Sequence, residues 1–197
     1  MSARKFVAAL AFVLVASIAP LHAQQKPKSD APPAAATSTP APPPPANPAD
    51  VASADAIMAA TYDVISGPAG QKRDWNRFLS LFVPGARLIP AGPDKEGKLG
   101  TRVITPEEYA KRADAYFLKN GFAEREIARR SERYGHIMQI FSTYESRHDA
   151  KDPTPFARGI NSFQLFFDGT RWWVVTIYWE EETPGNPLPA EFLKSQP

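Results

Sequence analysis

The chain has 197 residues, with 23 lysine and arginine residues, 21 aspartate and glutamate residues and no cysteine. The lack of cysteine excludes disulfides, zinc–thiolate sites and thiol nucleophiles, so the folded part must be stabilised by its hydrophobic core. Four of the basic and two of the acidic residues precede residue 51, which leaves 19 of each sign in residues 51–197. A domain with this balance lacks the basic surface that nucleic-acid binding requires.

Residues 1–23 have the pattern of an export signal. Arg4 and Lys5 precede an uncharged apolar run over residues 6–18, which is shorter than the roughly 20 residues that a membrane-spanning helix needs. A break at Pro20 and the small residue Ala23 predict cleavage after Ala23. The mature protein would be periplasmic or secreted, without a membrane association. An uncleaved anchor is the alternative, and the lack of cysteine after the apolar run excludes a lipoprotein.

Residues 24–50 are rich in proline, alanine and glutamine and contain four consecutive prolines at 42–45. Such a segment has little to bury and cannot offset the entropy lost on ordering. We expect a disordered, extended linker, with a proline-recognition ligand as the alternative. Residues 51–197 have the length of one domain.

Three helices are predicted at the start of this domain. Apolar residues at helical spacing predict the first over residues 53–66, ended by Gly67 and Pro68. Asp74 is a suitable N-cap for a short second helix that Pro84 and Gly85 would end. The run Thr105-Pro106-Glu107-Glu108 is a capping box that begins the third helix, and the Asn120-Gly121 pair ends it.

The remaining pattern alternates and predicts strands. A short strand is expected over residues 86–89, a long charged strand over 122–133, and three further strands over 136–149, 158–170 and 171–182. Helices followed by a run of antiparallel strands indicate an α+β fold, with the helices on one face of the sheet.

The last strand is apolar on both faces, so both faces must be covered. One set of side chains is expected to face the helices: Trp173, Val175, Ile177 and Trp179. The alternate set would form a dimer face on the outer side of the sheet: Trp172, Val174, Thr176 and Tyr178. The alternative to a homodimer is that a long loop or the C-terminal tail covers that outer face.

Several features of this domain resemble the nuclear transport factor 2-like superfamily, also called SnoaL-like. They are the first helix ending near Gly67, residues 74–86, the strand pair 142–147 and 158–163, and the closing Asp168-Gly169-x-Arg171-Trp172-Trp173. The resemblance implies a cone-shaped, curved antiparallel sheet packed on about three N-terminal helices. It also implies a pocket inside the cone and dimerisation through the outer sheet face. The superfamily hosts many activities, so the fold does not reveal the function.

Within this superfamily, ketosteroid isomerases have a tyrosine on the first helix and a carboxylate base just after the second. Tyr62 is similar in position to that tyrosine, but residues 86–90 contain no carboxylate. A proton-abstracting site needs a titratable group within hydrogen-bond reach. The remaining candidates for an acid or base are Glu181, near the predicted pocket mouth, and Glu145 on a central strand.

The residues expected to line the pocket are mostly aromatic and could equally be core side chains: Tyr62, Trp75, Phe78, Tyr109, Tyr116, Asn161 and Trp179. Such a lining is typical of a small-molecule site. His136 and His148 lie at opposite ends of one predicted strand and cannot share a metal, so we expect neither metal nor cofactor.

The leading hypothesis from the sequence is therefore an exported, homodimeric domain that binds a small apolar or aromatic ligand. One alternative is a cofactor-independent isomerase, dehydratase or hydrolase. The other is a structural or partner-binding module.

Overall fold

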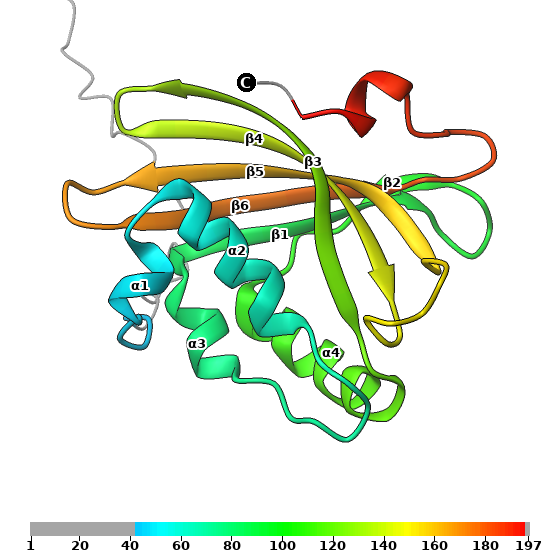
Figure 1. The fold of residues 1–197 in the computed structure, drawn as a ribbon, viewed down its shortest axis with the longest axis horizontal. Coiled ribbons are helices and arrows are strands. Elements are labelled where there is room, and N and C mark those ends of the chain that lie inside the picture. The colour runs from blue at the N-terminus through cyan, green and yellow to red at the C-terminus, as the bar shows by residue number, and fades with distance from the viewer. Residues whose placement is uncertain (1–41, 196–197) are drawn as a thin grey trace, which may run out of the picture. The chain divides into compact units, whose positions relative to one another are not determined.

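The computed structural model describes residues 42–195, so the predicted signal peptide and most of the predicted linker lie outside the described residues. A six-stranded sheet with the strand order β2-β1-β6-β5-β4-β3 curves over a layer of helices on one face (Figure 1). This arrangement confirms the predicted α+β fold. None of the helices in the described region is both long and apolar enough to cross a membrane.

The helices and strands follow one another in the predicted order, with three additions, α1, β2 and the 3-10 helix η1. The helices are α1 (Pro48–Val51), α2 (Ala54–Ile65), α3 (Trp75–Ser80), α4 (Pro106–Asn120) and η1 (Ala190–Leu193). The strands are β1 (Phe82–Pro93), β2 (Leu99–Thr101), β3 (Ala123–Tyr134), β4 (Ile137–Arg147), β5 (Ala157–Phe167) and β6 (Trp172–Glu181).

The helix caps predicted at Asp74 and Thr105 are present, and Ser53, which was predicted to lie within the first helix, caps α2. The side chains of Ser53 and Asp74 accept hydrogen bonds from backbone amides of α2 and α3. At the start of α4, the Thr105 hydroxyl accepts from the Glu108 amide, and the Glu108 carboxylate accepts from the Thr105 amide at 2.9 Å. These caps satisfy backbone donors that would otherwise lack partners, which is why the starts of α2, α3 and α4 could be read from the sequence.

Gly121 ends α4 with a φ of 71°, in the left-handed region that favours glycine. A Cβ at this position would also overlap the carbonyl oxygen of His148 and lie 3.0 Å from the Ala69 nitrogen. Gly121→Ala should therefore reduce the free energy of unfolding by more than about 2 kcal/mol in urea titrations. Gly97→Ala is the control, because Gly97 has a φ of +81° but no neighbour within 4 Å. It should cost only the backbone strain, about 1 kcal/mol.

The sheet is mixed, which corrects the prediction of an antiparallel sheet. Strand β1 pairs in parallel with β6, and the other neighbouring strands are antiparallel. Strand β1 is also longer than the predicted 86–89 and begins at Phe82, just after α3. Its partner explains the extension, because the Val174 amide donates to the Leu81 carbonyl at 2.9 Å and brings the start of β1 onto β6.

The folded part begins before residue 51. Asn47 caps α1, and Asp50 is buried, although the sequence placed both in the linker. Asp50 accepts from the Nε of Arg77 at 2.7 Å, and Arg77 also contacts Asp63 at 2.5 Å. These ion pairs attach α1 to α3 and α2, and so to the folded domain.

Strand β6 contains a β-bulge that the sequence did not predict. Gln164 pairs with Thr176, but the next residue, Leu165, pairs with Val174, so Val175 is an extra residue. An extra residue reverses the alternation of side chains on either side of it. Trp172 and Val174 therefore lie in the core at 5% and 0% exposure, rather than on the predicted dimer face.

The other half of β6 follows the predicted alternation. Ile177 is buried in the core, and Trp179 packs against it. On the opposite face Tyr178 is 44% exposed. Thr176 is buried at 8% exposure, although its partner Gln164 is exposed. Of the predicted dimer face, only Tyr178 is an exposed side chain.

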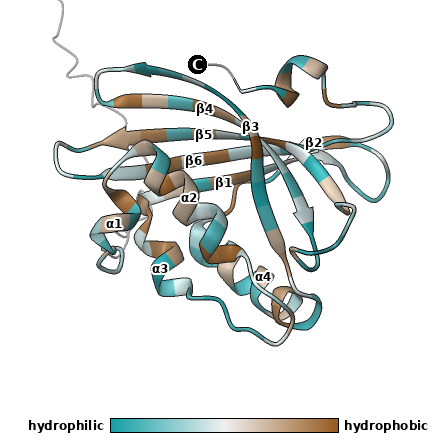
Figure 2. Cartoon of the chain, viewed as in Figure 1, coloured by the Kyte–Doolittle hydropathy of each residue, from teal (hydrophilic) through white to brown (hydrophobic). Residues whose placement is uncertain are grey.

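The core lies between the helices and the concave face of the sheet, and Figure 2 shows hydrophobic residues on α2 and on the central strands. Strand β3 is largely hydrophilic (Figure 2), in keeping with its place at the sheet edge. A polar edge strand discourages unwanted strand pairing.

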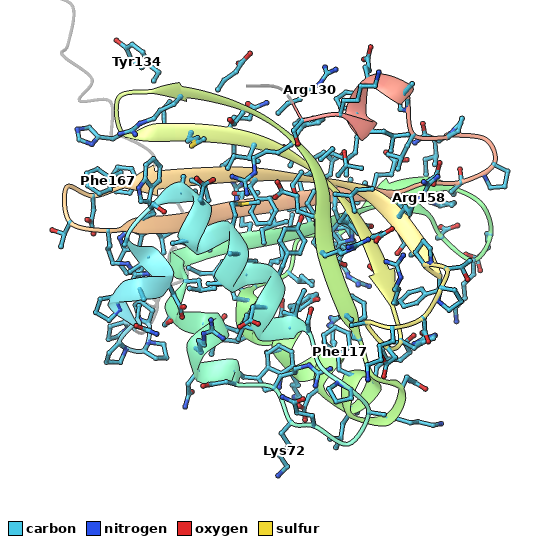
Figure 3. The ribbon with its side chains drawn as sticks, in the orientation of Figure 1. Lys72, Phe117, Arg130, Tyr134, Arg158 and Phe167 are labelled. Carbon is cyan, nitrogen blue, oxygen red and sulfur yellow. The ribbon has the colours of Figure 1, made fainter. Side chains whose placement is uncertain are left out.

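The C-terminal segment lies on the other face of the sheet. Phe192 of η1 stacks on Phe141 of β4 with ring centroids 6.0 Å apart, and the Arg130 guanidinium lies 4.5 Å from the Phe192 ring centre. The Thr143 hydroxyl donates to the Phe192 carbonyl at 2.6 Å. Figure 3 shows Arg130 beside this segment, away from Phe117 on the helix side. The C-terminal tail thus covers the β3–β4 part of the outer face, rather than the outer face of the last strand, as the alternative to a dimer had predicted.

Candidate functional site

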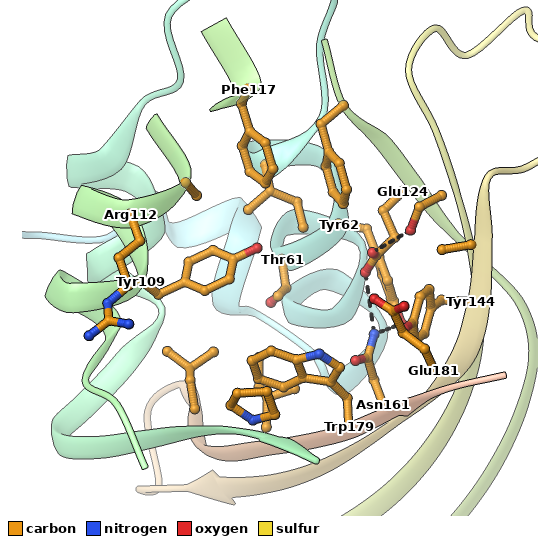
Figure 4. Close-up of a pocket in the computed structure, with 18 of the residues that line it drawn as sticks. Thr61, Tyr62, Tyr109, Arg112, Phe117, Glu124, Tyr144, Asn161, Trp179 and Glu181 are labelled. Atoms are coloured by element: carbon orange, nitrogen blue, oxygen red, sulfur yellow. Dashed lines mark hydrogen bonds between the residues drawn. The ribbon is translucent and has the colours of Figure 1, made fainter. Parts of the chain in front are cut away.

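A cavity of about 360 Å³ lies between α2, α4 and the concave face of the sheet (Figure 4). Six of the seven predicted pocket residues line it: Tyr62, Phe78, Tyr109, Tyr116, Asn161 and Trp179. Trp75 does not. Its indole donates to Asp114 at 2.7 Å and stacks on Phe117, so it packs between α3 and α4 behind the cavity wall.

Each wall follows the periodicity of its element. On α4 a stripe at helical spacing faces the cavity: Tyr109, Arg112, Ala113, Tyr116 and Phe117. On the sheet the lining residues alternate, as Asn161 and Phe163 do on β5. On β6, the alternating residues after the bulge face the cavity, namely Ile177, Trp179 and Glu181. Without that bulge, the residues that precede it would point to the opposite face.

Tyr62 belongs to a chain of hydrogen bonds. The Ser142 hydroxyl donates to the Glu126 carboxylate at 2.9 Å, and the Ser142 and Tyr62 oxygens are 2.6 Å apart. Since serine has one hydroxyl hydrogen, Tyr62 must donate to Ser142. Asn161 donates to the Tyr62 oxygen at 3.1 Å. The Tyr62 hydroxyl hydrogen is therefore already used within the protein and cannot be given to a ligand.

Glu124 is the acidic group that the sequence analysis missed. Its two carboxylate oxygens accept from Ser146 at 2.8 Å and from Asn161 at 3.3 Å, and the side chain lines the cavity. Figure 4 shows these hydrogen bonds joining Glu124, Asn161 and Tyr62. Burial raises the pKa of Glu124 from 4.5 to about 7, the hydrogen bonds from Ser146 and Asn161 oppose that rise, and Glu181 adds to it. Glu124 can thus give or take a proton near neutral pH.

The sequence did contain one sign of this residue. Glu124 and Glu126 alternate with Arg125, so both acids lie on one face of the predicted strand. The many charges of the strand suggested only that it is partly solvated. The structure shows instead that its concave side faces α2 and the cavity.

The two other predicted carboxylates differ in their positions. Glu181 lines the cavity, as expected. Glu145 does not, because it forms ion pairs with Arg147 and, at 2.5 Å, with Arg125. The Arg147 hydrogen bond, followed by that of Arg125, lowers the pKa of Glu145 despite its burial. A carboxylate held ionised by two arginines outside the cavity is unsuited to acid–base chemistry there, which corrects its selection as a candidate.

Several polar groups of the cavity wall remain available to a ligand. Within residues 42–195, no hydrogen bond involves the hydroxyls of Tyr109 and Tyr144 or the indole N–H of Trp179, and all three side chains line the cavity. Tyr109 and Trp179 meet edge to face with ring centroids 6.5 Å apart. The site therefore combines aromatic walls with a few unpaired donors.

Neither His136 nor His148 lines the cavity. His136 stacks on Phe167, and His148 stacks on Phe156. In residues 42–195, no three histidine, aspartate or glutamate side chains gather as a metal site would require.

Comparison with known proteins yields no matching family model and no matching curated protein. Among solved structures, a protein of unknown function with a cystatin-like fold from Nostoc punctiforme is 13% identical with a TM-score of 0.48. The match covers 66% of this chain and 89% of that one. A nuclear transport factor 2-like protein of unknown function from Shewanella baltica is 14% identical with a TM-score of 0.44, over 64% of this chain and 89% of that one. Another such protein from Methylobacillus flagellatus is 12% identical with a TM-score of 0.43, over 66% and 95%.

No conclusion about activity follows from structures this distant. The fold of this chain is a curved sheet wrapped over helices, with a cavity on its concave side. This topology is that of the α+β domain that the sequence predicted.

Proposed function

We propose that the domain binds a small, largely apolar molecule with one or two rings in the cavity between α2, α4 and the sheet. The observation that carries this proposal is the preformed space of about 360 Å³, walled by Phe78, Tyr109, Tyr116 and Trp179. This volume lies near the lower end of the range of about 300–1,000 Å³ for small-molecule sites, which suits a compact ligand. A purely structural module would have no need to leave this space unfilled.

Calorimetric titration of the mature protein with 2-naphthol tests this proposal. Ala113 lines the cavity, whereas Ala115 is exposed on the same helix. Ala113→Phe should fill the space and weaken binding at least about tenfold, and Ala115→Phe should leave binding unchanged. Equal binding by wild type and Ala113→Phe would place the naphthol outside the cavity and refute the proposal.

A second candidate function is cofactor-independent proton transfer, and Glu124 favours it. A base works best when its pKa is near the working pH, and that of Glu124 is about 7. In D₂O, Glu124 would take a proton from the carbon beside the carbonyl of bound 1-tetralone, and a deuteron would return to that carbon. NMR should show exchange that is catalysed by the wild type and slowed about 100-fold or more by Glu124→Gln. Equal exchange rates would leave only the binding function.

We also propose export through residues 1–23 and a homodimer through the uncovered part of the outer sheet face. Support for the dimer is limited to the exposed Tyr178, because η1 covers β3 and β4. If two copies associate through that face, the molar mass of Tyr178→Arg measured by light scattering should be that of a monomer. An unchanged mass would assign any dimer to another surface.

A further inference from the structure

Four charged residues line the cavity, namely Glu124, Glu181, Arg102 and Arg112. Figure 4 shows Arg112 beside Tyr109, across the cavity from Glu124, Asn161 and Glu181. The aromatic ring of Trp179 lies between the two groups (Figure 4). A ligand that spans the cavity would therefore meet positive charge at one end and carboxylates at the other.

Neither arginine is occupied by a carboxylate of the described residues. The ion pairs of residues 42–195 engage other arginines, namely Arg77, Arg125, Arg129, Arg147 and Arg158. The carboxylate one turn before Arg112, that of Glu108, accepts from the Thr105 amide at 2.9 Å in the capping box. It is thereby turned toward the start of α4.

Both arginines are fixed to the wall by their backbones. Arg112 lies three residues after Tyr109 on α4, and both residues line the cavity. Arg102 follows β2, and its amide donates to the Pro90 carbonyl of β1 at 3.3 Å. Arg112 on α4 and Arg102 after β2 both line the cavity without a carboxylate partner among the described residues. Such groups suit an anionic group, because guanidinium binds carboxylate and phosphate oxygens in pairs.

We infer that the ligand of this cavity is an organic anion with one or two rings. Its anionic group would contact Arg102 and Arg112, and an uncharged hydrogen-bond donor at its other end would contact Glu124. The reverse orientation would place the anion against Glu124 and Glu181. This inference rests on the proposed binding function and adds the charge and the orientation of the ligand.

Calorimetry with three matched probes tests the inference: 6-hydroxy-2-naphthoate, its methyl ester and 2-naphthoate. The hydroxynaphthoate should bind about tenfold more tightly than the ester, because the arginines are solvent-exposed and an exposed ion pair is modest in strength. Arg112→Gln and Arg102→Gln should each reduce this preference several-fold. The matched control is Lys111→Gln, an exposed cation beside Arg112 that does not line the cavity, and it should leave the preference unchanged. The 2-naphthoate lacks the hydroxyl donor and should bind several-fold more weakly.

Failure of this inference is distinguishable from failure of the binding function. Equal or tighter binding of the methyl ester, still abolished by Ala113→Phe, would keep the binding function and overturn the inference. A preference for the anion that Lys111→Gln reduces as much as Arg112→Gln would also overturn it, because the effect would then be one of general charge. Absence of binding by all the probes and by 2-naphthol would overturn both.

Discussion

Glu124→Gln should remove a loss of stability that the wild-type protein shows between about pH 4.5 and pH 7. Burial raises the folded-state pKa of Glu124 from 4.5 to about 7, so in this window the folded protein binds more protons than the unfolded chain. The free energy of unfolding must then fall as pH rises through the window. By linkage the loss approaches about 3 kcal/mol at most. Glutamine remains neutral, so it escapes this loss. Its amide oxygen can accept from Asn161, and its amide N–H can donate to the Ser146 hydroxyl.

Urea titrations at pH values from 5 to 8 measure the effect as the difference between variant and wild type. The difference should increase in favour of Glu124→Gln up to about pH 7 and then level off. Glu132→Gln is the control, because Glu132 is exposed on the same strand. A constant difference between Glu124→Gln and wild type would mean that Glu124 is ionised at pH 5 and is not a candidate acid or base.

Trp172→Ala should destabilise the protein far more than Trp173→Ala. Trp172 is 5% exposed in the core and packs on Phe167 with ring centroids 5.4 Å apart. Removing a buried tryptophan leaves a cavity and costs about 3–5 kcal/mol. Trp173 lies on the outer face, where it contacts Asp168 at 2.7 Å and the guanidinium of Arg171. Its loss should cost about 1 kcal/mol.

The two variants distinguish between the two possible orientations of the Trp172 and Trp173 side chains on β6. Strict alternation through the strand, as the sequence predicted, would place Trp173 inward and Trp172 outward. The bulge at Val175 reverses them. Urea unfolding of both variants decides the matter, and a larger loss for Trp173→Ala would argue against the bulge.

Features that depend on neighbours along the chain could be predicted from the sequence. The caps at Ser53, Asp74 and Thr105 satisfy amides only two to four residues away, so their patterns are visible in any short window. The positive φ of Gly121 belongs to the same class. The strands and their hairpins followed from alternation and turn residues, and together these elements specified the α+β class. Tyr109 and Tyr116 are seven residues apart, a helical spacing that places both on one face of α4.

Features that depend on contacts between residues far apart in the chain could not be predicted, because these contacts form only in the folded protein. The bulge in β6 arises where β5 and β1 both pair with it, and no local pattern in β6 marks the extra residue. The same holds for Glu145, which two arginines hold outside the cavity, and for Trp75, which Asp114 holds on α4. In the sequence, Glu124 is one of several charged residues of a polar strand. In the fold, β3 curves over α2. Burial then raises its pKa, and that burial is produced by packing between segments far apart in the chain.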